Sequence, residues 1–141
     1  MSFDKIMSIA GSGINAQLVR MNATASNLAN AGVVSGTSEG AFRAQRPVFS
    51  ALLEGETAGG FGELPGGVRV DEIVDDTKPI EQIYEPSSPM ADADGYVYAS
   101  NVNEVEELIE MLDASRAYQN NVEIVSTAKD LMVRTLEIIK V

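Results

Sequence analysis

The sequence predicts a mainly α protein with a small β-rich insert, in which long N- and C-terminal helices form a coiled-coil-like pair and the insert lies between them. Apolar residues recur every seven positions near both ends of the 141-residue chain, which is the spacing of helices that pack against a partner. The middle segment, 31–102, holds all five prolines, ten of the twelve glycines and six of the eight aromatic residues. We therefore expect a terminal helical domain, 1–30 plus 103–141, and a β-rich insert, 31–102, with a flexible Gly-rich loop.

The C-terminal segment, 103–141, predicts one unbroken helix because it contains neither glycine nor proline. Asn101 or Asn103 can cap its start, and the glutamates that follow favour the positive end of the helix dipole. A single helix cannot bury its own apolar stripe, so we expect this stripe to be an interface. Its residues are Leu108, Met111, Tyr118, Val122, Val125, Met132 and Ile139, with Leu136 alongside.

The N-terminal segment, 3–30, predicts a second helix of marginal stability. Gly11 and Gly13 each cost about 1 kcal/mol relative to alanine in a helix interior. We expect this helix to be ordered only when it packs against the C-terminal helix or another subunit. Its expected interface row is Met7, Ile14, Met21 and Leu28. A smaller and more polar companion row consists of Phe3, Ala10, Gln17 and Thr24.

The insert is expected to contain short strands separated by turns and loops. Strands are expected where β-branched and aromatic residues gather, at 42–53, 68–74, 80–84 and 96–99. Residues 33–40 and 55–67 are rich in glycine and small polar residues, which favours loops. A turn at 75–79 is expected to separate the second and third strands.

Charge and hydropathy exclude several classes of function. Ten basic and 21 acidic residues give a net charge of −11, which argues against binding to nucleic acid or to an anionic membrane surface. No apolar run approaches the roughly 18 residues of a membrane span, so we expect no membrane insertion. The N-terminus lacks the basic lead of a secretory signal. If the protein leaves the cytoplasm, we expect a route without a cleaved signal peptide.

The sequence offers no catalytic, cofactor-binding or metal site. It contains no histidine and no cysteine, which removes the usual general base, zinc ligands and thiol nucleophile. Asp75 and Asp76 are best explained as a hydrophilic turn, because adjacent residues of an extended segment point to opposite faces. Asp92 and Asp94 resemble part of a calcium loop, but Gly95 follows too early for that loop. A turn with glycine at positive φ is therefore expected there.

Several motifs resemble one known family. They are SNLAN at 26–30, FRA at 42–44, DGYVY at 94–98, NVN at 101–103 and ASRAYQ at 114–119. This set resembles the bacterial flagellar basal-body rod protein family, in its proximal-rod branch, and the likeness covers nearly the whole chain. Ser26 to Asn30 alone is shared widely among axial proteins, whereas the later motifs indicate the branch.

The resemblance implies a structural, non-enzymatic axial subunit without a cofactor. Such a subunit is exported unfolded by the flagellar type III apparatus, without a cleaved signal, and assembles in the periplasmic rod of the basal body. Its terminal helices pack into the rod and transmit torque. The implied partners are further copies of the chain, rod subunits of the FlgB, FlgF, FlgG and FliE types, and the export apparatus.

Three alternatives remain open at the level of sequence. The first is a sibling rod protein of the FlgB type, against which the motif at 114–119 argues. The second is a small hydrolase that uses carboxylates of the insert, although no convergent set of such groups is recognisable. The third is a cytoplasmic coiled-coil regulator or chaperone, which predicts retention inside the cell.

Overall fold

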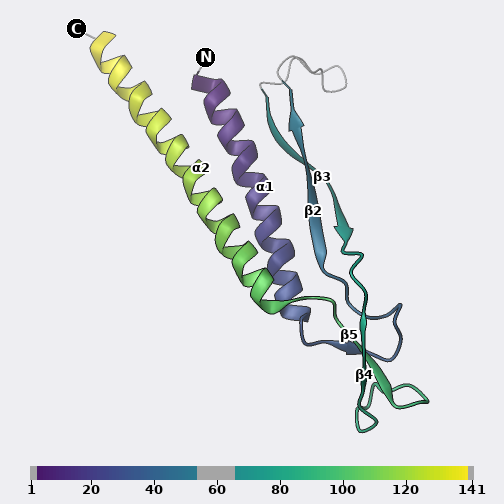
Figure 1. Ribbon diagram of the computed structural model, residues 1–141. Helices are drawn as coiled ribbons and strands as arrows, with labels where there is room; N and C mark the ends of the chain where they lie inside the picture. Colours follow the sequence, from purple (N-terminus) through teal and green to yellow (C-terminus); the bar gives the residue numbers. More distant parts are fainter. Residues whose placement is uncertain (1–2, 54–65, 140–141) are drawn as a thin grey trace. The chain divides into compact units, whose positions relative to one another are not determined.

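The computed structural model describes residues 3–53 and 66–139, and for residue 139 it describes the backbone alone. Two long helices stand at the ends of the chain and short strands lie between them in sequence (Figure 1). The elements are α1 (Phe3–Asn30), β1 (Val34–Ser35), β2 (Gln45–Leu52), β3 (Gly67–Asp75), β4 (Glu81–Tyr84), β5 (Tyr96–Ala99) and α2 (Glu104–Ile139). The expectation of two terminal helices with a small β insert is therefore confirmed.

The helix termini follow local capping chemistry. Asn103 caps α2, because its Oδ1 accepts hydrogen bonds from the backbone N–H groups of Val105 at 3.0 Å and Glu106 at 3.2 Å. At the end of α1, the side-chain amide of Asn30 donates to the carbonyl oxygen of Ser26 at 2.8 Å. Of the two predicted cap residues, Asn103 is the one that caps α2.

The insert differs from the sequence-based expectation in its details. The first long strand begins at Gln45 rather than at residue 42, and β3 extends through Asp75, which was expected in the turn. Val34 and Ser35 form β1 where a loop was expected, because they pair with Ala99 and Tyr98 of β5. That pairing is long-range and leaves no local signal in the sequence. The predicted Gly-rich loop at 55–67 lies mostly outside the described residues.

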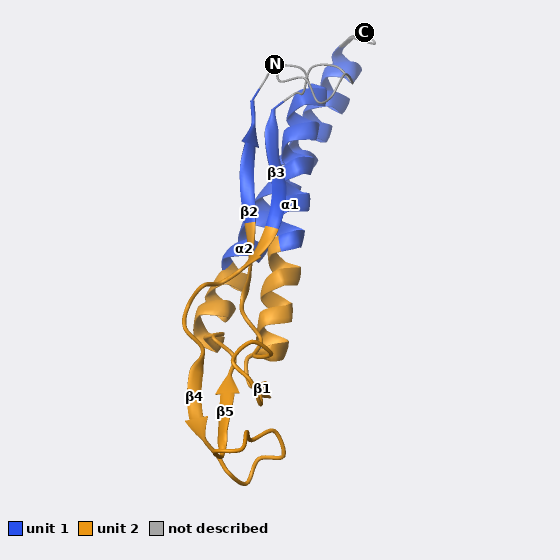
Figure 2. Ribbon diagram, turned by 90° about the vertical axis from the view of Figure 1, so that its right-hand side faces the viewer, with its two compact units in different colours: residues 1–19, 48–72, 113–141 blue, residues 20–47, 73–112 orange. Residues whose placement is uncertain are grey.

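Contacts divide the chain into two units, and each unit contains parts of α1, α2 and the insert (Figure 2). Unit 1 consists of 1–19, 48–72 and 113–141, and unit 2 consists of 20–47 and 73–112. Strands β2 and β3 pair as a two-stranded sheet. The second sheet, with strand order β1-β5-β4, lies within unit 2.

In unit 1, α1 lies close to α2 and to the start of β3. A Cβ atom on Gly13 of α1 would lie 2.9 Å from Oδ1 of Asn121 in α2, so the two helices touch where glycine stands. The start of β3 lies against α1, where the backbone N–H of Val68 donates to Oγ of Ser12 at 3.1 Å. Gly67 has a φ of +132°, and a Cβ there would lie 2.5 Å from the same Oγ. Glycine is required at this contact.

Unit 2 contains the antiparallel sheet and its small core. Strand β4 pairs with β5 over four residues, from Glu81↔Ala99 to Tyr84↔Tyr96. Val97 of β5 is fully buried, and so is Ala44, the residue before β2. The rings of Tyr84 and Tyr96 meet edge to face with centroids 5.1 Å apart.

Candidate functional site

The sides of α1 and α2 that are buried within each unit carry small residues. In the described part of the chain, the buried apolar residues of the helices are Ala10, Ala16, Ala23, Ala114 and Ala128. Alanine rows allow two helices to approach closely, and they bury little apolar surface per residue. The companion row predicted for α1 is the more buried one, since Ala10 and Thr24 are each 3% exposed.

The predicted interface row of α1 is partly accessible to solvent in the single chain. Met7 is exposed, whereas Ile14, Met21 and Leu28 are half-buried. Nothing in residues 3–53 and 66–139 fully covers these side chains, and the assignment of this row as an interface stays a prediction.

The predicted interface stripe of α2 divides into half-buried and exposed positions. Met111, Tyr118 and Val125 are half-buried. Leu108, Val122 and Met132 are exposed, as is Leu136 beside them. The side chain of Ile139 lies outside the described residues. Leu108 has neighbours on the same outward side of the helix, and these are Val105, Ile109 and Leu112.

A buried carboxylate forms the centre of unit 2. Glu107 of α2 is fully buried. Its Oε2 accepts a hydrogen bond from Nδ2 of Asn27 in α1 at 2.9 Å. Its Oε1 lies 2.6 Å from Nη2 of Arg46 in β2, which supplies the compensating charge. Arg46 is also 3.7 Å from a carboxylate oxygen of Asp76. A buried carboxylate with such partners avoids the cost of an unpaired charge.

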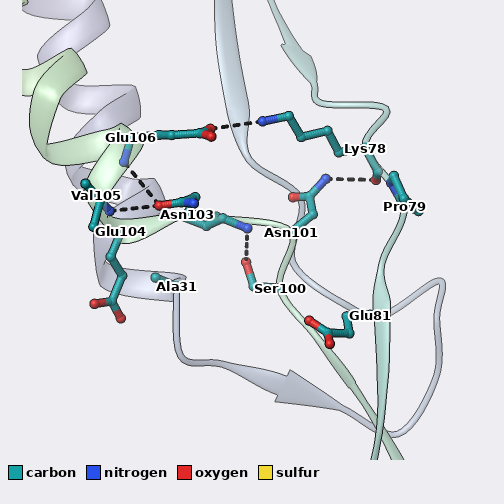
Figure 3. Close-up of a pocket in the computed structure, with 11 residues that line it drawn as sticks. Ala31, Lys78, Pro79, Glu81, Ser100, Asn101, Asn103, Glu104, Val105 and Glu106 are labelled. Atoms are coloured by element: carbon teal, nitrogen blue, oxygen red, sulfur yellow. Dashed lines mark hydrogen bonds and ion pairs between the residues drawn. The ribbon is translucent and has the colours of Figure 1, made fainter.

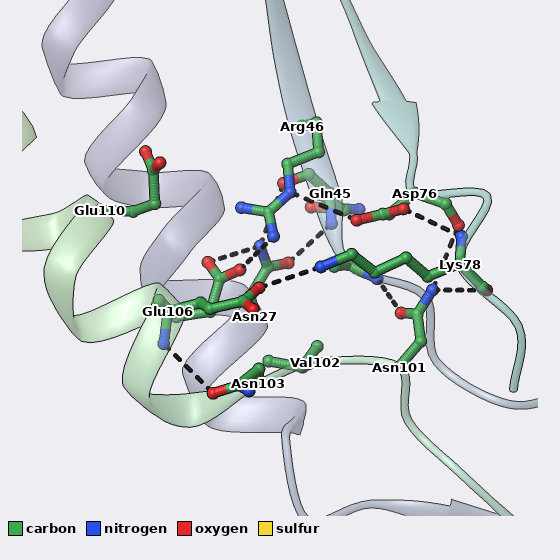
Figure 4. Close-up of polar contacts among 12 residues, drawn as sticks. Asn27, Gln45, Arg46, Asp76, Lys78, Asn101, Val102, Asn103, Glu106 and Glu110 are labelled. Carbon is green, nitrogen blue, oxygen red and sulfur yellow. Dashed lines mark hydrogen bonds and ion pairs between the residues drawn. The ribbon is translucent and has the colours of Figure 1, made fainter. Parts of the chain in front are cut away.

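Two asparagines bind the backbone around this carboxylate. The side chain of Asn27 makes a two-way pair with Gln45, accepting from its N–H at 2.7 Å and donating to its carbonyl at 3.0 Å. The side chain of Asn101 accepts from the N–H of Ala44 at 2.7 Å and donates to the carbonyl of Asp76 at 3.2 Å. Figure 4 shows the side chains of both asparagines amid these polar contacts. Together they fix the segment that enters β2.

Further ion pairs surround the cluster. Arg20 of α1 pairs with Glu110 of α2 through its guanidinium group. Lys78 pairs with Glu106 at 2.9 Å, and this exposed contact raises the pKa of Lys78 above its usual value, with Glu106 as the main cause. Because both side chains remain about half exposed, this pair adds little to stability.

Two hollows lie on the described surface, one in each unit. In unit 2, a hollow of about 640 Å³ lies beside the start of α2, where Lys78, Glu81, Ser100 and Asn103 are among the lining residues (Figure 3). In unit 1, a groove of about 280 Å³ is lined mainly by apolar side chains of the two helices, including Phe3, Ile6, Ile124 and Leu131. The second hollow leaves further apolar surface uncovered.

One member of each acidic pair that was considered as a site has a structural role. Oδ1 of Asp92 accepts from the N–H groups of Asp94 at 3.0 Å and Tyr96 at 2.9 Å, and Gly95 has a φ of +84°. The expected turn with glycine at positive φ is confirmed. Oδ1 of Asp76 accepts from the N–H of Lys78 at 2.9 Å. Across the described residues, no group of three or more acidic, His or Cys side chains is placed to hold a metal ion.

Sequence reasoning missed the importance of Glu107 and Arg46. Asn27 was noticed only as part of a motif, and Glu107 only as a helix-start glutamate. A signal was present, because Glu107 continues the row of Met111, Ala114 and Tyr118 at helical spacing. An acidic residue on a buried row needs a cationic partner. No local pattern identifies Arg46 as that partner, since it lies 61 positions away in the chain.

Comparison with known proteins gives consistent matches at both ends of the chain. A family model described as "Flagella basal body rod protein" matches residues 7–36. A second model, described as "Flagellar basal body rod FlgEFG protein C-terminal", matches residues 93–138. These two segments include most of α1 and α2.

Relatives match almost the whole chain. The flagellar basal-body rod protein FlgC of Yersinia enterocolitica is 43% identical over 136 residues, which cover 96% of this chain and 97% of the relative. The protein of the same name from Salmonella typhimurium is 40% identical with the same coverage. One from Buchnera aphidicola of Schizaphis graminum is 41% identical and covers 98% of both chains. The chain therefore belongs to the FlgC family of flagellar basal-body rod proteins, whose members are structural subunits of the rod.

Proposed function

We propose that this chain is an axial subunit of the proximal rod that assembles through the outward apolar faces of its two terminal helices. One observation supports the proposal above others. The buried sides of the helices carry alanines, whereas larger apolar side chains such as Leu108, Leu112 and Leu131 remain exposed. Complete burial of a leucine is worth about 1.5–3 kcal/mol. A neighbouring subunit that covers these side chains would gain that free energy.

The coiled-coil-like pairing and the division into domains belong to the same proposal. The helical part, 1–30 plus 103–141, would supply contacts with neighbouring subunits, and the insert, 31–102, would lie on the outside of the rod. Interface residues would include Met7, Ile14, Met21 and Leu28 of α1. In α2 they would include Leu108, Met111, Tyr118, Val122, Val125, Met132 and Ile139.

Replacement of Leu108 by aspartate tests the outward stripe. Leu108 is 57% exposed, so an aspartate there would remain in contact with water in the isolated chain. The variant should therefore fold normally but should not enter the rod, because the new carboxylate would have to be buried against a neighbour. The measurements are the melting temperature of the purified chain, swimming in soft agar, and the presence of the chain in isolated basal bodies.

Leu53→Asp provides the matched control for this experiment. Leu53 is 69% exposed and follows β2 rather than lying on a helix. We expect this strain to swim. A Leu108→Asp strain that swims as well as wild type would show that the outward stripe of α2 is not an assembly surface.

We propose further that the chain is exported by the flagellar type III apparatus without cleavage of a signal, and that it transmits torque within the periplasmic rod. None of the helices in the described ranges is long and apolar enough to cross a membrane. Its partners would be further copies of itself, rod subunits of the FlgB, FlgF, FlgG and FliE types, and the export apparatus. A photo-reactive residue at position 108 should crosslink to such subunits in cells, and crosslinks solely to cytoplasmic proteins would contradict the proposal.

No catalytic role is proposed. The family is structural, and two of the carboxylates considered for a hydrolase have structural roles: Asp92 in its turn, and Asp76 in contacts with Lys78 and Arg46. No specific observation favours an enzyme or a cytoplasmic regulator over a rod subunit.

A further inference from the structure

The outward stripe of α2 is an apolar surface that ends in a positive charge. Each of its four residues is more than half exposed and lies three or four positions from two of the others, so all four share one side of the helix. They are Val105, Leu108, Ile109 and Leu112. Arg116 follows Leu112 about one turn later, and its exposed side chain forms no ion pair with the residues that the structure describes. An exposed apolar surface of this kind marks a site of interaction with another protein.

The groove in unit 1 has the complementary properties. It lies between the start of α1 and the second half of α2, and it is hollow where the stripe protrudes. Phe3, Ile6, Ile124 and Leu131 supply most of its apolar lining. Glu123 is the first residue of α2 that lines it, and this exposed carboxylate has no ion pair within 3–53 and 66–139. The groove therefore places a negative charge beside an apolar surface, whereas the stripe places a positive charge there.

We propose that the outward stripe of one copy packs into the groove of a second copy, with Arg116 of the first beside Glu123 of the second. The contact would remove apolar side chains of both surfaces from water and would pair two charges that have no ion-pair partner within the described chain. This inference rests on the proposed function, in which the stripe is an assembly surface, and it names a second copy of the same chain as the occupant.

The stripe and the groove that meet must belong to different copies. Both surfaces are carried by α2, the stripe at 105–112 and the helix residues that line the groove at 123–131. A continuous helix cannot place its early turns against its own later turns. The contact also joins two unlike surfaces, so a first contact leaves one stripe and one groove open to which further copies can add.

Disulfide formation between single-cysteine variants tests the contact, because the chain contains no cysteine of its own. Leu112→Cys in the stripe and Thr127→Cys in the groove are purified separately, mixed at high concentration and oxidised. Intact mass distinguishes the mixed disulfide from the two homodimers. We expect the mixed product to exceed either homodimer by about tenfold, because a disulfide needs closely placed Cα atoms and only the mixed pair meets this condition.

Ser126→Cys is the matched control for the groove variant. Ser126 is exposed and precedes Thr127 by one residue, but it does not line the groove. We expect its mixed disulfide with Leu112→Cys to be no more abundant than the homodimers. A mixed product of Leu112→Cys and Thr127→Cys that is equally unselective would overturn the inference.

Exchange of the two charges provides an independent measurement. Arg116→Glu should weaken self-association of the purified chain by about tenfold in sedimentation velocity, because it places two carboxylates side by side. Arg116→Glu combined with Glu123→Arg should restore it. Lys129→Glu changes the net charge by the same amount at an exposed position that does not line the groove, so it should have little effect. Failure of the double exchange to restore association would contradict the pairing.

These outcomes are separable from a failure of the proposed function. If no selective disulfide forms but Leu108→Asp still prevents entry into the rod, the stripe binds a different rod subunit. The inference then fails and the proposed function stands. If Leu108→Asp strains swim as well as wild type, the stripe is not an assembly surface and both fail.

Discussion

At the scale of single residues, Glu107 shows how one charged side chain can be both buried and tolerated. It is fully buried, yet Arg46 retains 32% of its side-chain exposure. The pair thus consists of a fully desolvated carboxylate and a guanidinium that still meets water. Loss of the guanidinium would leave the carboxylate without a counter-charge, whereas loss of both groups would leave an apolar contact.

Arg46→Met alone should therefore destabilise the chain more than Arg46→Met/Glu107→Leu does. We expect a loss of about 3 kcal/mol in the free energy of unfolding for the single variant, at the low end of values for broken buried pairs because Arg46 is partly exposed. Urea unfolding followed by circular dichroism measures both variants. Equal stability of the single variant and the wild type would mean that Glu107 does not depend on Arg46.

At the scale of elements, glycines have opposite roles in the β4–β5 connection and in α1. Gly95 has a φ of +84°, and a Cβ there would lie 3.0 Å from the ring of Tyr84 and 3.1 Å from Pro86. Gly11 lies inside α1, and a Cβ there would meet nothing within 4 Å. The first glycine is required by the turn, and the second only weakens a helix.

Gly95→Ala should lower the free energy of unfolding by about 1–2 kcal/mol, because a Cβ is disfavoured at positive φ. The matched substitution Gly11→Ala should raise it by roughly 0.5–1 kcal/mol, through a better helix propensity. Thermal or urea unfolding of the two variants checks both signs. Destabilisation by Gly11→Ala would contradict this prediction. It would mean that another segment of the same chain packs against α1 at this position.

At the scale of the whole molecule, the two units differ in what holds their parts of α1. In unit 2, Asn27 and Arg20 bond to α2 and to the start of β2. In unit 1, buried alanines and the glycine contact at Gly13 are the main features of the helix pair. Small side chains release little free energy on burial, so unit 1 is expected to gain most from neighbours in the rod.

Amide hydrogen exchange of the isolated chain should reflect this difference. We expect fast exchange across 3–19 of α1 and slower exchange across 20–30, because opening of the second part would expose the buried carboxylate cluster. Peptide-level mass spectrometry after brief labelling measures both segments. Strong protection of 3–19 in a monomer would contradict the view that this part of α1 is ordered mainly by assembly.

The sequence by itself determined the two helices, their approximate ends, the family and the turn at Gly95. These features rest on local signals, such as the absence of glycine and proline from 104–139, the cap at Asn103 and the motif at 26–30. The interface rows that seven-residue spacing predicts stay a prediction, and the side of α1 that is most buried in the chain carries the smaller residues.

Only the tertiary structure decided how distant segments are joined. Pairing of Val34 with Ala99 created β1 inside an expected loop. The contact of Glu107 with Arg46 joined α2 to β2, although the two residues are 61 positions apart in the sequence. The physical reason is the same in both cases. A backbone hydrogen bond or an ion pair between residues far apart in the chain depends on the whole fold, whereas caps, turns and helical spacing depend on immediate neighbours.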